Sequence, residues 1–199
     1  MDFTNAFKSE IFRPLVTLFV PGCIAVAPHI VVANYYAKQV GEFWDKYPSA
    51  FTFLAVIFAL AAGLTLEDIG MAIERQWDKL IYKGEPEHIE RWHEYLQLDV
   101  DDEIIAQRYL RLTLTWMKFE LAMVPALLSF GVGLVWVNNL YDVWKTRGVV
   151  IACLIIAALL AFLIHESYVS AQTLSLTRAD VIEGARRRAT REASKKKKE

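Results

Sequence analysis

Four long blocks of apolar residues alternate with polar segments along this chain, and none of the blocks contains Asp, Glu, Lys or Arg. The blocks are Leu15–Val32, Phe51–Leu66, Leu121–Val137 and Val149–Ile164. Crossing the hydrocarbon core of a bilayer takes about 20 apolar residues in a helix, and flanking aromatic residues, which favour bilayer interfaces, extend each block. Soluble core helices rarely lack charge over such lengths four times. The pattern predicts an all-α integral membrane protein with four transmembrane helices.

The polar segments divide the chain into six predicted parts, and the two outside loops contain the turn-forming residues Gly41, Pro48, Asn138, Asn139 and Gly148. The parts are a cytoplasmic amphipathic N-terminus (1–14), transmembrane helices 1 and 2 with a short outside loop (15–72), a cytoplasmic helical cap (73–118), transmembrane helices 3 and 4 with a short outside loop (119–166), a cytoplasmic helix extension (167–185) and a basic disordered tail (186–199).

The distribution of positive charge predicts the orientation in the membrane. Of the 22 Lys and Arg residues, all but Lys38, Lys46, Lys145 and Arg147 lie in segments on the same side as the N-terminus. Because Lys and Arg are enriched in cytoplasmic segments, we expect both termini in the cytoplasm, and the membrane to be the bacterial inner (plasma) membrane. The first apolar block lacks the basic leader of a cleaved signal peptide, so we expect it to be retained.

The second apolar block continues without a proline into a charged helical pattern that reaches Ile81. At about 100° per residue, one face of this helix carries both glycines and acids. They are Gly63, Glu67, Gly70, Glu74 and Asp78. Small residues allow close helix approach, so we predict that this acidic stripe packs against another helix over most of its length. Two alternatives remain for the acidic side chains: neighbouring basic residues neutralise them, or they stay open to water and ions.

The first apolar block contains helix-weakening residues around Pro21, Gly22 and Pro28, with His29 next to them. A proline removes one hydrogen bond from the helix, and neighbouring groups have to satisfy the freed carbonyl. One interpretation is a gate or a polar site in a discontinuous helix. The favoured interpretation is a kinked packing helix in which His29 bonds a backbone carbonyl.

Five ionisable residues lie at one predicted depth, near the cytoplasmic boundary of the membrane. They are Glu67, Asp68, Glu120, His165 and Glu166. The favoured interpretation is that they are interfacial residues bonded to neighbouring Arg and Lys side chains. The alternative is an ion or pore site, because rings of carboxylates in an oligomer select cations.

Motifs for metal binding or catalysis are missing from the sequence. His88 and His93 are five residues apart, which does not place them on one helix face, and neither Cys23 nor Cys153 lies near a histidine. Both cysteines lie in apolar blocks, where we expect small packing residues and no disulfide framework. Phosphate-binding glycine loops and nucleophile motifs do not occur. We therefore predict no metal, no cofactor and no catalytic residues.

Candidate partner-binding or lipid-binding residues lie in the cap and in the basic tail. They are Arg91, Trp92, Arg108, Arg111, Arg186, Arg187 and Arg188. A basic segment next to a membrane attracts anionic lipid. The formal net charge of the whole chain is −1, so we expect no specific binding to nucleic acid.

Four spans are too few for the inverted repeats of many transporters, and small residues in the spans favour a homo-oligomer. We expect a sensor, effector or scaffold for a cytosolic protein partner at the inner membrane face, and not an enzyme. By architecture alone, this plan is similar to that of small membrane subunits of bacterial antiviral-defence systems. The alternatives are an oligomeric cation channel or pore with a carboxylate-lined cytoplasmic mouth and, third, a membrane-embedded enzyme.

Overall fold

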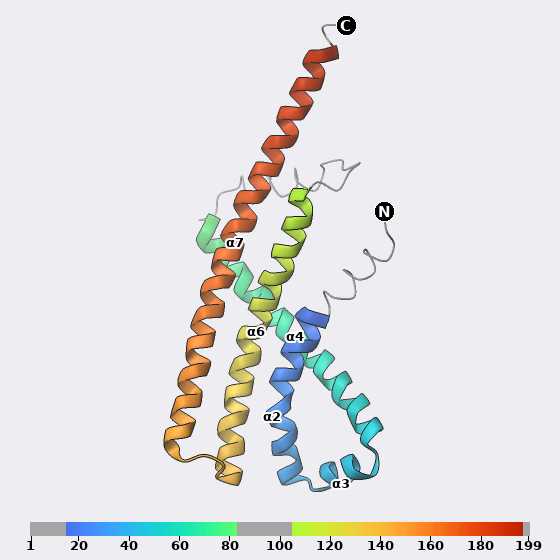
Figure 1. The fold of residues 1–199 in the computed structure, drawn as a ribbon, viewed down its shortest axis with the longest axis vertical. Helices are drawn as coiled ribbons and strands as arrows, with labels where there is room; N and C mark the ends of the chain where they lie inside the picture. Colours follow the sequence, from blue (N-terminus) through green and yellow to red (C-terminus); the bar gives the residue numbers. More distant parts are fainter. Residues whose placement is uncertain (1–14, 83–104, 197–199) are drawn as a thin grey trace.

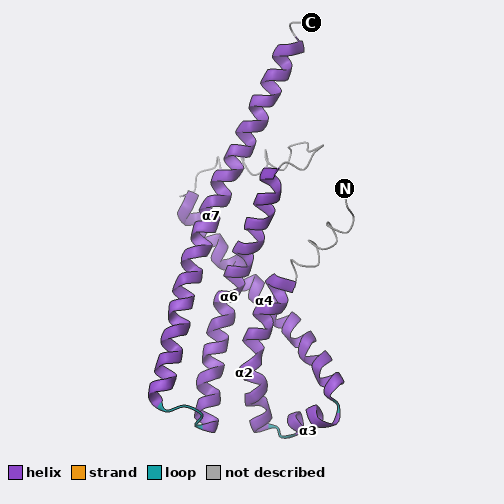
Figure 2. Ribbon diagram, in the orientation of Figure 1, coloured by secondary structure: helices purple, strands orange, loops and turns teal. Residues whose placement is uncertain are grey.

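The computed structural model describes residues 15–82 and 105–196, and the regular structure in this part of the chain is entirely helical (Figures 1 and 2). A π-helical turn comes first, and five α-helices follow it. The elements are η1 (Leu15–Phe19), α2 (Val20–Tyr36), α3 (Gln39–Lys46), α4 (Pro48–Tyr82), α6 (Ile105–Tyr141) and α7 (Thr146–Lys196).

Four of the helical segments are long and apolar enough to cross a membrane, which confirms the predicted helical class and the number of apolar helices. They are Leu15–Tyr36, Pro48–Leu80, Tyr109–Tyr141 and Thr146–Gly184. Helix α7 has 51 residues, so at about 1.5 Å per residue it is roughly 76 Å long, whereas the hydrocarbon core of a bilayer is about 30 Å thick. Helices α4 and α6, with 35 and 37 residues, also exceed the length needed for one crossing.

The bundle has two different ends. The short connections, residues 37–47 between α2 and α4 and residues 142–145 between α6 and α7, lie together at what we call the turn end (Figure 1). The opposite end, which we call the extension end, contains the last turns of α4, the first turns of α6 and the C-terminal part of α7.

Helix α4 crosses the bundle diagonally and meets the other long helices one after another (Figure 1). It first meets η1 and α2, where a Cβ added at Gly63 would overlap the carbonyl oxygen of Leu18 and one added at Gly22 would overlap that of Ala59. It then meets α6, where a Cβ on Gly70 would lie 3.1 Å from the carbonyl carbon of Leu121. The predicted close packing of the glycine face is therefore confirmed.

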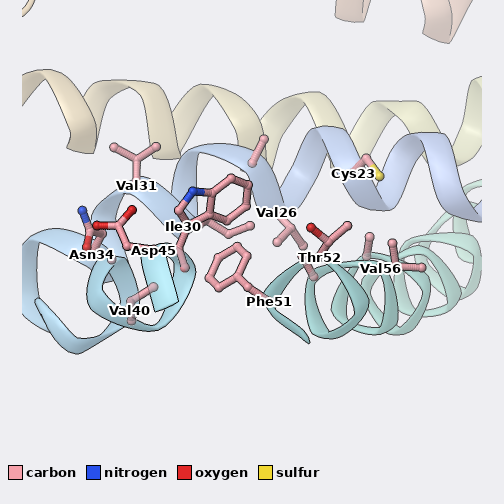
Figure 3. Close-up of a pocket in the computed structure, with 15 residues that line it drawn as sticks. Cys23, Val26, Ile30, Val31, Asn34, Val40, Asp45, Phe51, Thr52 and Val56 are labelled. Carbon is pink, nitrogen blue, oxygen red and sulfur yellow. The ribbon is translucent and has the colours of Figure 1, made fainter. Parts of the chain in front are cut away.

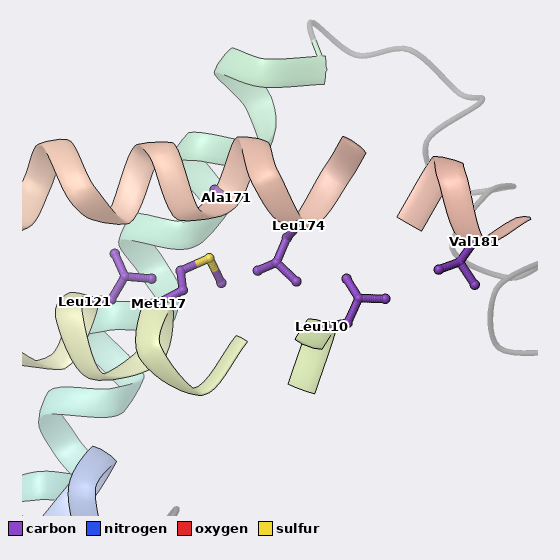
Figure 4. Packing of buried hydrophobic residues seen from close by; sticks show 6 residues of the cluster. All are labelled: Leu110, Met117, Leu121, Ala171, Leu174 and Val181. Atoms are coloured by element: carbon purple, nitrogen blue, oxygen red, sulfur yellow. The ribbon is translucent and has the colours of Figure 1, made fainter. Parts of the chain in front are cut away.

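A buried apolar cluster joins α6 and α7 at the extension end (Figure 4). Side chains from α4 pack against its edge, namely those of Ile73 and Trp77. The cluster itself consists of Leu110, Met117, Leu121, Ala171, Leu174 and Val181. Because it follows α7 as far as Val181, α6 supports α7 well beyond the predicted end of the fourth transmembrane helix at Ile164.

The connections at the turn end differ from the predicted loops. Gly41 lies inside the short helix α3, and Pro48 is the first residue of α4, where its missing N–H leaves no helical bond unmade. Between α6 and α7 the chain turns at Asp142, which has a φ of 50°, and the side-chain oxygen of Asn138 accepts a 2.7 Å hydrogen bond from the Trp144 backbone N–H. The left-handed backbone of Asp142 and this side-chain bond from Asn138 of α6 therefore form the turn without a glycine.

Helix α7 continues to Lys196 and so includes most of the tail (186–199) that the sequence analysis predicted to be disordered. The prediction was wrong for residues 186–196 because it gave weight to charge and not to helix propensity. Ala, Arg, Lys and Glu all favour a helix, and Arg187 forms an i,i+4 ion pair with Glu183 at 2.5 Å. The predicted N-terminal segment (1–14) and most of the predicted cap, residues 83–104, lie outside the described residues.

Candidate functional site

The acidic face of α4 meets a basic residue of α6 at the level of Glu67. The Lys118 ammonium lies 3.6 Å from the Glu67 carboxylate, and both side chains are about three-quarters buried. Two turns further along α4, the half-buried Glu74 interacts electrostatically with Lys118 and with Arg178 of α7. Basic side chains from two neighbouring helices therefore face the predicted acidic stripe, as the neutralised interpretation requires.

Glu120 forms a separate polar contact with α7. Its carboxylate accepts a 3.2 Å hydrogen bond from the Ser170 hydroxyl, and Glu166 is close enough to interact with it electrostatically. Two carboxyl groups thus lie near the seam between α6 and α7. A charge pair of this kind is destabilising unless a proton, a cation or water reduces the repulsion.

The five predicted ionisable residues do not converge on one point. Lys118 and Glu120 are two positions apart on α6, so their side chains point to different sides of that helix. As a result, Glu67 and Glu120 belong to different seams, while Asp68 and His165 are exposed. Among the described residues, no group of three or more His, Cys, Asp or Glu side chains is placed to hold a metal ion.

The proline-containing helix α2 is continuous through Pro28 and packs directly on α6. A Cβ added at Gly133 of α6 would lie 2.5 Å from Pro28 Cγ, so the ring fits against a bare backbone. His29 Nε2 lies 3.2 Å from the carbonyl oxygen and 3.1 Å from the hydroxyl of Ser129, and that hydroxyl donates to the carbonyl of Ala25 at 3.4 Å. Ser129 therefore bonds α2 on both sides of its proline.

This geometry agrees with the packing interpretation of His29 and not with a discontinuous helix. With the Nε2–H tautomer, the imidazole donates to a backbone carbonyl, as that interpretation expects. Pro21 and Gly22 are both buried, and Gly22 lies at the crossing with α4. The predicted gate residues thus lie at two helix crossings, one with α4 and one with α6.

A polar contact that the sequence did not indicate joins α4 to α7. The Trp77 indole N–H donates to the Ser167 hydroxyl at 3.3 Å, and that hydroxyl donates to the Ile164 carbonyl at 2.9 Å. Ser167 is completely buried, and the Trp77 ring also meets the edge of Tyr168 at a centroid distance of 5.5 Å. The sequence around Trp77 does not indicate Ser167 as its partner, because the two residues are 90 positions apart and meet only where α4 crosses the bundle.

Several exposed hydroxyl groups on the long helices are satisfied within their own helix. Thr52, Thr65, Thr113 and Thr173 each donate to the carbonyl four residues earlier, at 2.9 to 3.1 Å. Such back-bonding hides the hydroxyl from an apolar environment. Thr52 and Thr65, which lie in the apolar part of α4, are therefore compatible with a lipid-facing position.

The predicted partner-binding or lipid-binding residues are only partly described. Arg111 is exposed on α6, and Arg186 and Arg187 are exposed on α7. Arg108 and Arg188 lie within the backbone of α6 and α7, but their side chains fall outside the description, as do Arg91 and Trp92 altogether. The described arginines of the predicted set all lie at the extension end.

Comparisons of this chain with protein-family models, with curated proteins and with solved structures found no match.

Proposed function

We propose that this protein is a membrane-embedded scaffold, of the sensor or effector kind, that binds a cytosolic protein through its extension end. The observation that carries the proposal is the packing of α7 on α6 at the extension end. Its C-terminal part packs on α6 through a buried cluster as far as Val181 and Ile182, and the helix then continues to Lys196. Binding residues on a supported helix keep a fixed position, which favours recognition of a partner.

Charge supports the choice of the extension end and its cytoplasmic orientation. Exposed Arg75, Lys79, Arg111, Arg186 and Arg187 all lie on the extensions of α4, α6 and α7. Lys and Arg concentrate in cytoplasmic segments of inner-membrane proteins, so we place this end in the cytoplasm, together with both termini. The exposed Arg186 and Arg187 near the end of α7 favour a partner that carries an acidic patch.

Exposed apolar surface supports a homo-oligomer. The outer face of α7 in its apolar part carries large exposed side chains, among them Ile151, Leu154 and Phe162. The alanines at 157, 158 and 161 are exposed on the same helix and are not used for packing within the chain. Small residues allow a second helix to approach closely in lipid.

Charge reversal at the end of α7 tests the proposal. We expect Arg186→Glu with Arg187→Glu to remove a stoichiometric soluble partner that co-purifies with the full-length wild-type protein. Lys145→Glu with Arg147→Glu changes the same charge at the turn end and is the matched control, which should retain the partner. The measurement is the amount of bound partner per chain after affinity purification in detergent, with size-exclusion profiles to show that each variant stays folded. Equal loss from both variants, or from neither, would contradict the proposal.

A cation pore is the second candidate, and the Glu120–Glu166 pair is the observation that favours it. Two carboxylates at one seam attract a cation. In liposomes, a pore predicts ion flux that Glu120→Ala abolishes and that Glu42→Ala, an exposed acid on α3, leaves unchanged. Membranes that stay ion-tight with the wild-type protein would eliminate this candidate.

A further inference from the structure

Helices α2 and α4 touch at one crossing and separate toward the turn end. The crossing is so close that Gly22 meets the backbone of Ala59 and a Cβ on it would lie 3.0 Å from the Gly63 nitrogen. From there to α3, which bridges the two helices, the gap widens (Figures 1 and 3). The result is a tapered space between two helices, which we call the α2–α4 cleft.

The cleft opens on both sides of the two helices. One opening has a volume of about 710 Å³ and the other about 640 Å³. Both are lined by Val26, Ile30, Val40, Phe51 and Ala55. The shared residues lie between the two openings, so the α2–α4 cleft is an apolar region that opens to the surroundings of the bundle on two sides.

The polar groups of the cleft are concentrated at its α3 end. Asn34 and Asp45 lie at that end, whereas Cys23 and Val56 line the narrow end (Figure 3). Thr52 and Thr65 also line the cleft, but their hydroxyls donate to their own helix, at Pro48 and Ala61. The cleft is therefore polar at its wide end and apolar along its length. A lipid molecule has the same division, with a polar headgroup and apolar acyl chains.

The short helix α3 is suited to an interfacial position. Phe43 and Trp44 turn toward the Phe51 ring, at centroid distances of 6.5 and 4.8 Å, while Glu42 and Lys46 are exposed. An amphipathic helix of this kind lies in the headgroup region of a bilayer. Lys38 and Lys46 are exposed at the two ends of α3, where their ammonium groups can pair with lipid phosphates.

The taper of the cleft favours a lipid chain over a transmembrane helix as its occupant. A helix with its side chains is about 10 Å wide, so it cannot follow the cleft to its narrow end, where α2 and α4 are in backbone contact at Gly22 and Ala59. A single hydrocarbon chain is narrower, and it follows a taper because it has no side chains. It also makes no hydrogen bonds, which suits the apolar lining.

We propose that the α2–α4 cleft binds one bilayer phospholipid, with an acyl chain along Val26, Ala55 and Ala59 and the headgroup beside α3. This inference rests on the proposed placement of the four apolar helices in a membrane. It goes beyond the scaffold function, because it assigns a ligand class to the opposite end of the molecule. The bound chain fills a gap that α2 and α4 leave open, and so becomes part of the packing between them.

Filling the cleft with a side chain tests the proposal. Full-length protein in mild detergent is given trace amounts of a phospholipid with a photoreactive diazirine in its acyl chain. In the wild type, we expect the label on the chain segments that line the cleft. Ala55→Trp should lower labelling and co-purified phospholipid about tenfold, since excluding two methylene groups from an apolar site changes a binding constant by about that factor. Ala157→Trp, on the exposed face of α7, is the matched control and should bind as the wild type does.

Two further measurements distinguish the ways in which the proposal can fail. Val26→Trp fills the same cleft from α2, so a loss seen with Ala55→Trp alone would indicate misfolding and overturn the proposal. Wild-type levels of label in both variants would also overturn it. Resistance of the wild-type membrane fraction to carbonate extraction tests the membrane placement separately, so a protein that is extracted would end the scaffold proposal together with this one.

A second copy of the chain in the cleft has its own signature. In a Cys153→Ser variant, Cys23 is the remaining thiol, and it lines the cleft. We expect mild oxidation in membranes to give no Cys23-linked dimer. A disulfide-linked dimer, lost again in Ala55→Trp, would show that protein and not lipid occupies the cleft.

Discussion

Helix α4 is packed in two different ways on the two sides of its crossing with α2. Toward the turn end it diverges from α2, and Phe53, Leu54 and Phe58 are exposed. Toward the extension end it meets α6 through Gly70 and α7 through Trp77. One helix thus borders an open apolar cleft at one end and contributes to a packed core at the other.

The proposed membrane placement gives a physical reason for this difference. In water, exposed apolar surface is unfavourable, so burial of Leu174 and its neighbours between α6 and α7 stabilises the extension end. In a bilayer, lipid tails are as apolar as the side chains, so helices gain nothing from the hydrophobic effect when they close on one another. An open cleft is therefore tolerated at the turn end, where lipid fills it, and would be unstable at the extension end.

The largest loss of stability is expected from a substitution at Gly63, which lies where α4 crosses η1 and α2. Both the open packing toward the turn end and the close packing toward the extension end begin at this crossing. In Gly63→Ala the added methyl group overlaps the Leu18 carbonyl, and neither backbone can move without separating the helices. We expect a loss of about 3 kcal/mol in the free energy of unfolding, measured by thermal unfolding in detergent. Gly131→Ala is the control, since its Cβ would lie 3.5 Å from Ile156 Cδ1, an ordinary contact. If the two variants unfold at the same temperature, the crossing does not hold the bundle together.

A smaller effect is expected from the core of the extension end. Leu174 is 3% exposed and Leu176 is 68% exposed on the same helix. Leu174→Ala should lower the free energy of unfolding by about 2.5 kcal/mol, because it leaves a cavity between α6 and α7, and Leu176→Ala should change it by less than about 0.5 kcal/mol. Hydrogen exchange should also show faster opening of the α7 extension in Leu174→Ala alone. Similar losses in both variants would mean that this end is not a packed core.

The smallest effect is expected at the ion pair between α4 and α6. Glu67 and Lys118 are 3.6 Å apart and partly exposed, so a double-mutant cycle with Glu67→Gln and Lys118→Met should give a coupling free energy of about 0.5 kcal/mol. The coupling should weaken in high salt, because the ions screen partly exposed charges. A coupling of several kcal/mol would show instead that this pair, and not the glycine contacts, determines where α4 crosses α6.

Much of the polar chemistry of the candidate site depends on partners that no sequence pattern identifies. The sequence placed Glu67 and Glu120 at similar depths, and that grouping suggested one cluster. The structure assigns them to Lys118 and Ser170, in two seams, because these carboxylates bond to different helices. Ser129 and Ser167 were not candidates at all, since a single serine in an apolar helix carries no periodic signal. Each becomes a bonding residue only where a neighbouring helix brings His29 or Trp77 to it.

The sequence by itself determined the helical class, the four apolar helices and the glycine-bearing face of α4. These features follow from local composition and from the period of the helix, which any segment expresses without its neighbours. The tertiary structure alone decided that α4 crosses diagonally, that α3 replaces a loop and that a cleft remains between α2 and α4. The direction of a crossing depends on which backbones approach at Gly22, Gly63 and Gly70. Each approach depends on two helices at once, so the sequence of one segment does not determine it.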